Sequence, residues 1–329
     1  MKRALNAALF LLILFLGWRF LDWALVRAVW QPDPQACRAA SGACWGFIVE
    51  KHRLIAFGTY PYEEHWRPGL ASLLLIALWV LTALRQRWWV VAAWAAGLVV
   101  IGILMWGGVL GLPYVENERW GGLILTLLLT TFGLAIAFPL SICLALGRRS
   151  ELPVIRAVCV AYIELIRGVP LISVLFMASV MLPLFLPAGV SIDKLLRALL
   201  ALILFAAAYL AEAVRGGLQA IPKHQYEAAD ALGLGYFQKT FLIVLPQALR
   251  IAVPPLVGTC IGFFKDTSLV LIIGLFDLLS TIKVSLNDPA WTGFGVEAYL
   301  FAAAVYFIFC YSMSLYSRRL EASAGRSLP

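Results

Sequence analysis

Apolar runs about as long as a membrane is thick recur along this chain of 329 residues, and they constrain its fold more than any other feature. A helix needs about 20 predominantly apolar residues to cross the hydrocarbon core of a bilayer. Most of the runs reach that length. We therefore expect an all-α integral membrane protein.

The composition agrees with this expectation. Hydrophobic residues make up 62% of the chain and charged residues 13%, with a mean hydropathy of +0.89, whereas soluble domains are about half apolar and a quarter charged. The net charge of +8 lies in short Lys and Arg clusters between apolar runs, which is typical of cytoplasmic loops in membrane proteins. No basic helix interleaved with aromatic residues appears, so we expect membrane lipid, and not nucleic acid, around the chain.

The hydropathy pattern and the charge clusters together predict about eight spans with both termini in the cytoplasm. The second run is shorter than an ordinary span. The first is predicted to be a retained helix, because it is too long for a cleaved signal peptide and no small-residue cleavage site follows it. The predicted spans are residues 5–26, 70–84, 88–110, 122–146, 158–186, 195–213, 251–276 and 297–316.

These spans divide into two regions. Residues 1–119 form an N-terminal extension with three spans and an extracytoplasmic loop at about 27–69. Residues 120–329 form a five-helix core with a cytoplasmic loop at about 214–250. Cys37 and Cys44 flank the polar part of the extracytoplasmic loop, where a disulfide and two free thiols are both possible.

The cytoplasmic loop has clear helix signals. Residues 222–232 are predicted to be a short helix, because proline suits its first turn and Gly233 is a natural left-handed terminator. A second short helix at 236–244 is predicted to stop before Pro246. The pair would expose a compact surface with Ala229 at its centre, suited to the close approach of another protein. An amphipathic hairpin lying on the membrane is the alternative.

The same loop resembles the EAA signature of the permeases of ATP-binding cassette (ABC) importers, in which Glu-Ala-Ala is followed by Gly and then by Ile-x-Leu-Pro. The matching residues are Glu227, Ala228, Ala229, Gly233, Ile243, Leu245 and Pro246. The resemblance implies a type I ABC-importer transmembrane fold. It also implies that the loop is the coupling helix that docks into the ATPase subunit, with Tyr226, Glu227, Ala228, Ala229, Gly233 and Pro246 as coupling residues.

About residues 120–320 resemble one branch of these permeases, the polar and general L-amino-acid permeases, most clearly at 162–170, 212–218 and 264–269. The resemblance implies an L-amino-acid substrate, an extracytoplasmic amino-acid-binding protein, ABC ATPase subunits, and a second permease chain that is a paralogue or a copy. It places the chain in a bacterial inner membrane. No cofactor is expected in this chain, since the partner ATPase uses ATP and magnesium.

Charged residues within spans are costly and usually functional. Lys265 and Asp266 stand mid-span, followed by Thr267 and Ser268. Adjacent residues on a helix are poorly placed to pair with each other. They could complement the carboxylate and ammonium of an amino acid, or form a structural bridge to Arg167 or Glu164; both interpretations stay open.

Residues Glu164 and Arg167 are spaced to pair on one helix face, and Gly168 and Pro170 then break the helix. The break would provide either helix-end amides for a substrate carboxylate or a kink that permits gating. Glu212 and Arg215, also three residues apart, are expected to support the cytoplasmic loop. The predicted substrate path comprises Glu164, Arg167, Gly168, Lys265, Asp266, Thr267 and Ser268.

Other classes of function fit less well. The chain lacks G-x-x-x-x-G-K-[ST], so it has no phosphate-binding loop of its own, and no catalytic or metal-ligand constellation indicates an enzyme. An ion- or proton-coupled secondary transporter is the alternative, but such folds often repeat internally, and neither half of this chain resembles the other. A membrane sensor would leave Lys265 and Asp266 without a purpose.

Overall fold

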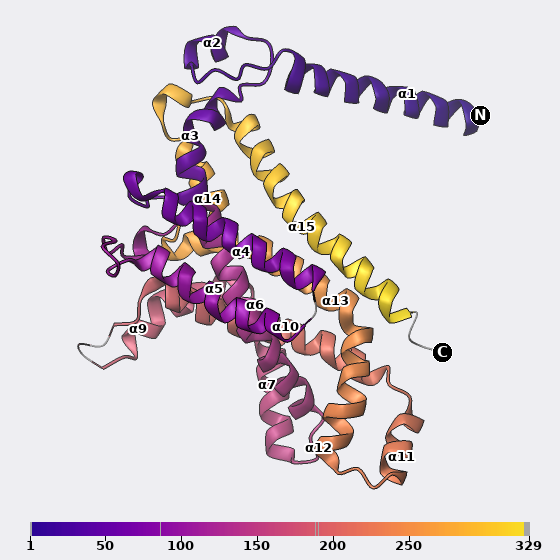
Figure 1. The fold of residues 1–329 in the computed structure, drawn as a ribbon. Coiled ribbons are helices and arrows are strands. Elements are labelled where there is room, and N and C mark those ends of the chain that lie inside the picture. Colours follow the sequence, from indigo (N-terminus) through magenta and orange to yellow (C-terminus); the bar gives the residue numbers. More distant parts are fainter. Residues whose placement is uncertain (1, 86, 188, 190, 326–329) are drawn as a thin grey trace.

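The structure is a computed structural model that describes residues 2–85, 87–187, 189 and 191–325 (Figure 1). Within these ranges every regular element is a helix, and extended pairing is limited to two isolated bridges. Seven helices are long and apolar enough to cross a membrane, or up to eight if one bent pair counts as a span. The prediction of an all-α membrane fold with about eight spans is confirmed.

The N-terminal third contains more helix than the sequence predicts. The segment at 27–69 is a folded region and not a plain loop, and the second span covers Tyr62–Leu84, 23 residues, instead of a short run from residue 70. The elements are α1 (Lys2–Leu21), the π-turn η1 (Asp22–Val26), α2 (Pro34–Ala39), α3 (Gly46–Phe57), η2 (Tyr62–Glu64), α4 (Trp66–Leu84), α5 (Trp89–Trp106) and η3 (Asn117–Arg119).

The remaining elements form the core and its connections. They are α6 (Gly122–Arg148), α7 (Pro153–Gly168), α8 (Leu171–Phe176), η4 (Met177–Met181), α9 (Leu182–Leu184), α10 (Lys194–Gln219), α11 (Lys223–Ala231), α12 (Tyr236–Gln238), η5 (Lys239–Val244), α13 (Leu245–Asp266), η6 (Thr267–Ile273), α14 (Leu278–Ser285), η7 (Pro289–Trp291) and α15 (Gly295–Gly325).

Two predicted boundaries in the core are wrong. The helix α10 runs six residues past Ala213, so the connecting segment begins only at Ala220. Pro246 does not end a helix, because helical structure is continuous over Tyr236–Ile273. A proline clashes with the carbonyl four residues earlier in an α-helix, but here the π-turn η5, whose hydrogen bonds reach five residues back, directly precedes it.

The predicted break after Arg167 is confirmed. Helices α7 and α8 meet at 104°. Val169 is extended, with φ −113° and ψ 137°, as is favoured for a residue before proline. Pro170 then precedes α8 as its N-cap.

The helix α10 is the centre of the bundle and packs against α6, α7 and α13. Its buried face carries mostly small residues, which let neighbouring helices approach closely, as is usual in membranes. The fully buried alanines among them include Ala198, Ala207 and Ala211. In Figure 1 α6 and α10 lie between α2 and α3 at one end of the molecule and α11 and α12 at the other.

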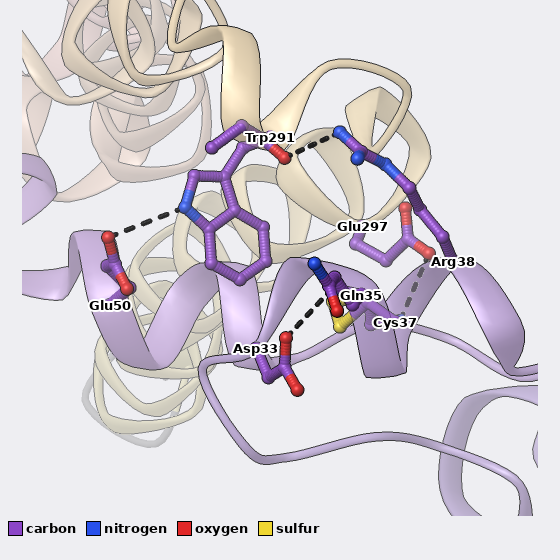
Figure 2. The surroundings of a disulfide bond; sticks show 9 residues. Asp33, Gln35, Cys37, Arg38, Glu50, Trp291 and Glu297 are labelled. Carbon is purple, nitrogen blue, oxygen red and sulfur yellow. Dashed lines mark hydrogen bonds between the residues drawn. A yellow bond between two sulfur atoms is a disulfide. The ribbon is translucent and has the colours of Figure 1, made fainter.

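At the α3 end, four elements that we call the cap (α2, α3, α14 and η7) pack together around an apolar cluster. Phe47 and Ile55 of α3 are buried with Ile282 of α14 and Trp291 of η7. Figure 2 shows the Cys37–Cys44 disulfide beside this cluster. The two Cα atoms lie 5.3 Å apart and both side chains are buried, so the open question of disulfide or free thiols is answered in favour of the disulfide.

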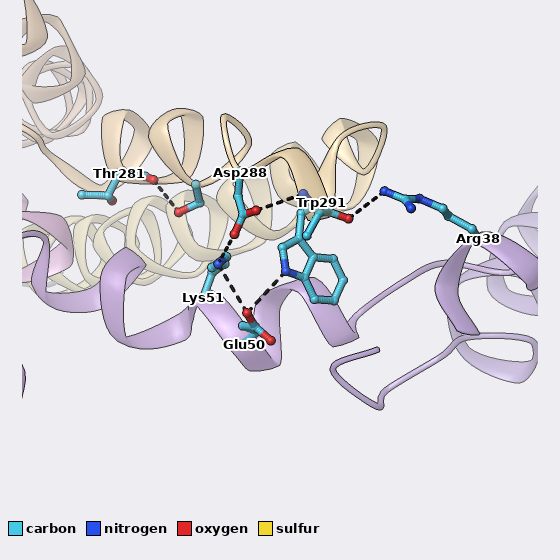
Figure 3. A network of polar contacts seen from close by, with 8 residues as sticks. Arg38, Glu50, Lys51, Thr281, Asp288 and Trp291 are labelled. Atoms are coloured by element: carbon cyan, nitrogen blue, oxygen red, sulfur yellow. Dashed lines mark hydrogen bonds and ion pairs between the residues drawn. The ribbon is translucent and has the colours of Figure 1, made fainter. Parts of the chain in front are cut away.

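Polar contacts join the same elements across the cap (Figure 3). Lys51 of α3 lies 2.7 Å from Asp288, and Trp291 donates to Glu50 at 3.4 Å. The hydrogen bond from Lys51 lowers the pKa of the Asp288 carboxyl below its usual 3.8. Burial is the largest single influence and disfavours the charged form of Lys51, but the hydrogen bonds and charges of Asp288 and Glu50 together raise the pKa of the amine above 10.5.

Helix α1 lies apart from the helix bundle. It extends away from the bundle in Figure 1, and only 6% of its most apolar window is buried. Its apolar side chains are exposed on every side. The helix is therefore suited to direct contact with lipid.

Candidate functional site

The segment that matches the EAA signature lies at the end of the molecule opposite the cap (Figure 1). Gly233 terminates it with φ +72°, in the left-handed region expected from the sequence. Glu227 and Ala228 are exposed on α11. Ala229, however, is 1% exposed and faces inward; the expectation that it is the centre of an exposed surface is wrong, because α11 packs against η5.

Three polar contacts hold α11 to the bundle. Arg149, just after α6, donates to the Tyr226 hydroxyl at 3.2 Å. Gln247 of α13 donates to Gln225 at 3.2 Å. An ion pair between Asp230 and Lys239 joins α11 to η5. The helix is thus fixed to two different spans while its outer face remains exposed.

Five charged side chains gather where α6, α7 and α10 meet; we call Arg148, Glu164, Arg167, Glu212 and Arg215 the charge cluster. Arg148 bridges Glu164 at 2.9 Å and Glu212 at 3.5 Å. Arg167 lies 3.6 Å from Glu212, and the Arg215 Nε donates to the same carboxylate at 2.9 Å. The predicted Glu212–Arg215 pair is confirmed. The predicted Glu164–Arg167 pair is wrong, because Arg148 and Glu212 are their partners instead.

A pocket of about 440 Å³ opens beside the charge cluster, within the usual range of about 300–1,000 Å³ for small-molecule sites. Its walls come from the end of α7, from α10 and from α13. Small residues leave it open, since a Cβ atom at Gly216 would meet nothing within 4 Å. Its polar and small lining residues include Arg167, Tyr209, Glu212, Gly216, Pro255 and Thr259.

The other predicted site residues lie at the end of α13, the helix that carries Pro255, and at the start of η6. α13 ends at Asp266 and gives way to the 3₁₀-helix η6 at Thr267. Lys265 is exposed, Asp266 and Ser268 are partly buried, and Thr267 is fully buried, donating to the Phe264 carbonyl at 2.8 Å. Among the described residues no ion pair joins Lys265 or Asp266 to Arg167 or Glu164.

The structure therefore separates the predicted path residues into two groups. Arg167 lines the pocket and Glu164 is linked to it through Arg148, whereas residues 265–268 mark a change of helix type further along α13. Such a change within a helix often marks a hinge. Sequence reasoning missed Arg148, Arg149 and Tyr209. The first two looked like ordinary topology-setting charges, and only their contacts distinguish them.

Comparisons with known proteins agree with this architecture. Residues 137–325 match the family model described as "Binding-protein-dependent transport system inner membrane component". The chain is 52% identical to the inner membrane amino-acid ABC transporter permease protein YhdY of Escherichia coli strain K12, over 92% of this chain and 83% of that protein. It is 38% identical to the glutamate/glutamine/aspartate/asparagine transport system permease protein BztC of Rhodobacter capsulatus, over 92% and 82%.

A solved amino-acid ABC transporter, crystallised with histidines, is similar in fold. Its chain is 30% identical with a TM-score of 0.55, and the match covers 61% of this chain and 92% of that one. A bundle of membrane-spanning helices with a broken span and an exposed short helix defines the permease class of membrane transporters. The chain belongs to the binding-protein-dependent transport system inner membrane components, the permease subunits of ABC importers.

Membership of this family determines several points. The chain is a multi-pass protein of the inner membrane, and it is a transport subunit whose ATPase activity resides in a separate subunit. Type I ABC-importer architecture, predicted from the EAA resemblance, is confirmed. The relatives are not secondary transporters, and no finding favours that alternative.

Proposed function

We propose that α11 is the segment through which the partner ATPase drives this permease. The observation that carries the proposal is the exposed face of a helix whose inner side is fixed to two spans by Arg149–Tyr226 and Gln247–Gln225. A protein that moves α11 therefore moves the bundle. ATP and magnesium belong to that partner in this proposal.

Charge reversal on α11 tests it. Glu227→Lys should abolish co-purification of the ATPase subunit with the permease, because Glu227 is exposed and carries no internal contact in the described structure. Glu151→Lys is the matched control: Glu151 is also an exposed carboxylate at the α6–α7 turn but lies outside α11. Equal recovery of the ATPase with both variants would refute the role of α11.

We further propose that the α11 end and both termini are cytoplasmic and that the cap is extracytoplasmic, where a binding protein delivers substrate. The disulfide supports this orientation, because disulfides persist in oxidising compartments such as the periplasm. The arginines that follow the spans at 148–149 and 318–319 support it through the positive-inside rule.

The cargo that fits best is an L-amino acid, as in the relatives named above. The charge cluster has three guanidinium groups and two carboxylates, 3 − 2 = +1, beside an open pocket. The carboxylate of an amino acid would neutralise the remaining charge, and Arg167 is the lining residue with a fork suited to it. Gly168 gives the backbone of the bend conformational freedom, and Pro170 lacks the amide hydrogen that would continue the helical hydrogen bonds.

Uptake by the complete complex in liposomes tests this cargo. A labelled amino acid should enter, while the matching amine without its carboxylate should not compete. Arg167→Gln should weaken uptake at low substrate concentration, whereas Arg156→Gln, an exposed arginine on the same helix, should not. Competition by the amine as strong as by the amino acid would refute recognition of the carboxylate.

A second permease chain completes the path in this proposal. The Pro255 face of α13 is open, since a Cβ atom at Gly258 or Gly262 would meet nothing within 4 Å, and Lys265 is exposed on the same apolar helix. A charge facing lipid at mid-membrane costs about 2.5–3.5 kcal/mol on insertion scales. A second permease chain, or a water-filled path between the two chains, would keep Lys265 away from lipid and so remove this energetic cost.

A further inference from the structure

We infer that the adjacent residues Arg148 and Arg149 form a relay between the coupling helix and the pocket, with Arg149 as a positioning residue that makes ATP-driven movement of α11 reach the substrate path. The inference rests on the proposed function of α11. It adds a specific connection between α11 and the charge cluster.

The two side chains leave the end of α6 toward different partners. Successive residues at a helix end point about 100° apart. Arg149 is directed to α11: it donates to the Tyr226 hydroxyl at 3.2 Å, and its guanidinium carbon lies 5.8 Å from the centre of that ring. The same Nη1 donates to the Leu218 carbonyl at 3.1 Å, near the end of α10. One residue thus holds α11 and α10 together.

Arg148 is directed to the charge cluster. It pairs with Glu164 of α7 and Glu212 of α10. Glu212 also pairs with Arg167, the residue before the 104° bend and a wall of the pocket. The contacts therefore run from Tyr226 to Arg149, through the peptide bond to Arg148, and then through Glu212 to Arg167.

The connection between α6 and α7 keeps this relay short. Only residues 149–152 separate Arg148 from α7. Ser150 accepts from the Leu152 amide at 3.2 Å, and Pro153 begins the next helix. A displacement of α11 consequently moves Arg149 and the start of α7 together, because the connection between α6 and α7 is too short to move independently of them.

A double-mutant cycle in the complete complex, reconstituted in liposomes with ATPase and binding protein, tests the relay. Arg149→Gln should lower uptake per ATP hydrolysed by at least about fivefold, the lower end of ordinary allosteric coupling. Arg149→Lys, which keeps the charge and a donor, should restore part of it. Tyr226→Phe combined with Arg149→Gln should be no worse than Arg149→Gln alone, because both remove the same contact.

The control is Arg156→Gln, whose side chain is exposed on α7 away from these contacts. Unchanged uptake per ATP in Arg149→Gln, or strictly additive losses in the double variant, would overturn the relay. If the relay is overturned but the ATPase still co-purifies with Arg149→Gln and no longer co-purifies with Glu227→Lys, the role of α11 stands. Failure of Glu227→Lys to affect co-purification would instead refute the proposed function itself.

Discussion

At the scale of single residues, substitutions can isolate the backbone conformation of Gly233 and the ion pair between Lys51 and Asp288. Gly233 holds a left-handed backbone angle at the end of α11 with open space around it, so its requirement is for backbone freedom and not for room. Lys51 and Asp288 form an ion pair between segments 237 residues apart, and the pair titrates at both extremes of pH.

Replacing Gly233 by alanine should weaken ATPase binding without removing it. A left-handed angle costs an ordinary L-residue roughly 1–2 kcal/mol, and about 1 kcal/mol corresponds to roughly fivefold in affinity. Gly233→Asn should lose less, since asparagine tolerates this region. Titration of detergent-solubilised permease with the ATPase measures both variants, and equal losses for Ala and Asn would contradict a backbone cause.

The Lys51–Asp288 pair should stabilise the cap only within a defined pH window. The pKa of Asp288 is lowered, so its contribution is present above pH 3.8 and disappears as pH falls through the lowered value. The pKa of Lys51 is raised, so its contribution is present below pH 10.5 and disappears as pH rises through the raised value. Thermal melting of the cap, monitored by tryptophan fluorescence at a series of pH values, should show this pH window.

Asp288→Asn is the informative variant, because asparagine can still cap η7 but carries no charge. Its melting temperature should lie below that of the natural protein at pH 7, and the difference should shrink as the pH falls below 3.8 through the lowered pKa of Asp288. Asp33→Asn, at the corresponding cap of α2 with no ion pair among the described contacts, should melt unchanged. A difference for Asp288→Asn that does not shrink as the pH falls below 3.8 would rule out the ion pair as its cause.

At the scale of elements, the sequence predicts which segments are helices better than where they end or what they touch. Spans are set by hydrophobic length, a local property. The start of α4 at Trp66 was missed because Arg67 looks like a loop residue, yet it is fully buried and donates to the Leu104 and Pro113 carbonyls at 2.6 and 2.9 Å. Arg148 as partner of Glu164 and Glu212, and Arg167 as partner of Glu212, were missed because these partners come from other helices.

Removing the disulfide tests how much this covalent link contributes to the stability of α2 and the cap. Cys37 and Cys44 are seven residues apart, and the chain-entropy treatment of such a short closed loop gives about 2.5 kcal/mol. Cys37→Ser with Cys44→Ser should therefore lower cap melting and expose α2 to proteolysis. Cys143→Ser, which removes an exposed free thiol, should have no effect. Identical melting of the two forms would show that the disulfide contributes nothing.

At the scale of the whole molecule, the described chain leaves an apolar face of α13 uncovered by other helices. The Gly258 and Gly262 positions of α13 are spaced as in close-packed membrane helix pairs, and each has open space beside it. The extension is not a separate body, since Phe264 of α13 is buried in the same cluster as Leu75 of α4 and Met105 of α5. The unfilled surface thus lies on the core.

Filling that surface should disrupt assembly. Gly262→Leu should reduce the number of permease chains per complex, because a large side chain prevents close helix approach. Gly17→Leu on α1 is the matched control: it also has open space around it, but α1 lies apart from the bundle. Native mass measurement of the detergent-solubilised complex gives the stoichiometry. An unaltered complex with Gly262→Leu would place the second chain on another face.

The cap has a consequence for how the protein is made. Lys51 and Asp288 are separated by 237 residues, which a ribosome adding about 5–20 residues per second needs about 12–50 seconds to cover. Cys37 and Cys44 leave the ribosome together and can be oxidised early, while Phe47 and Ile55 of α3 must wait for α14 and η7. The apolar surface of α3 therefore stays exposed through most of synthesis. It is covered only after almost the entire chain has been translated and α14 and η7 have formed.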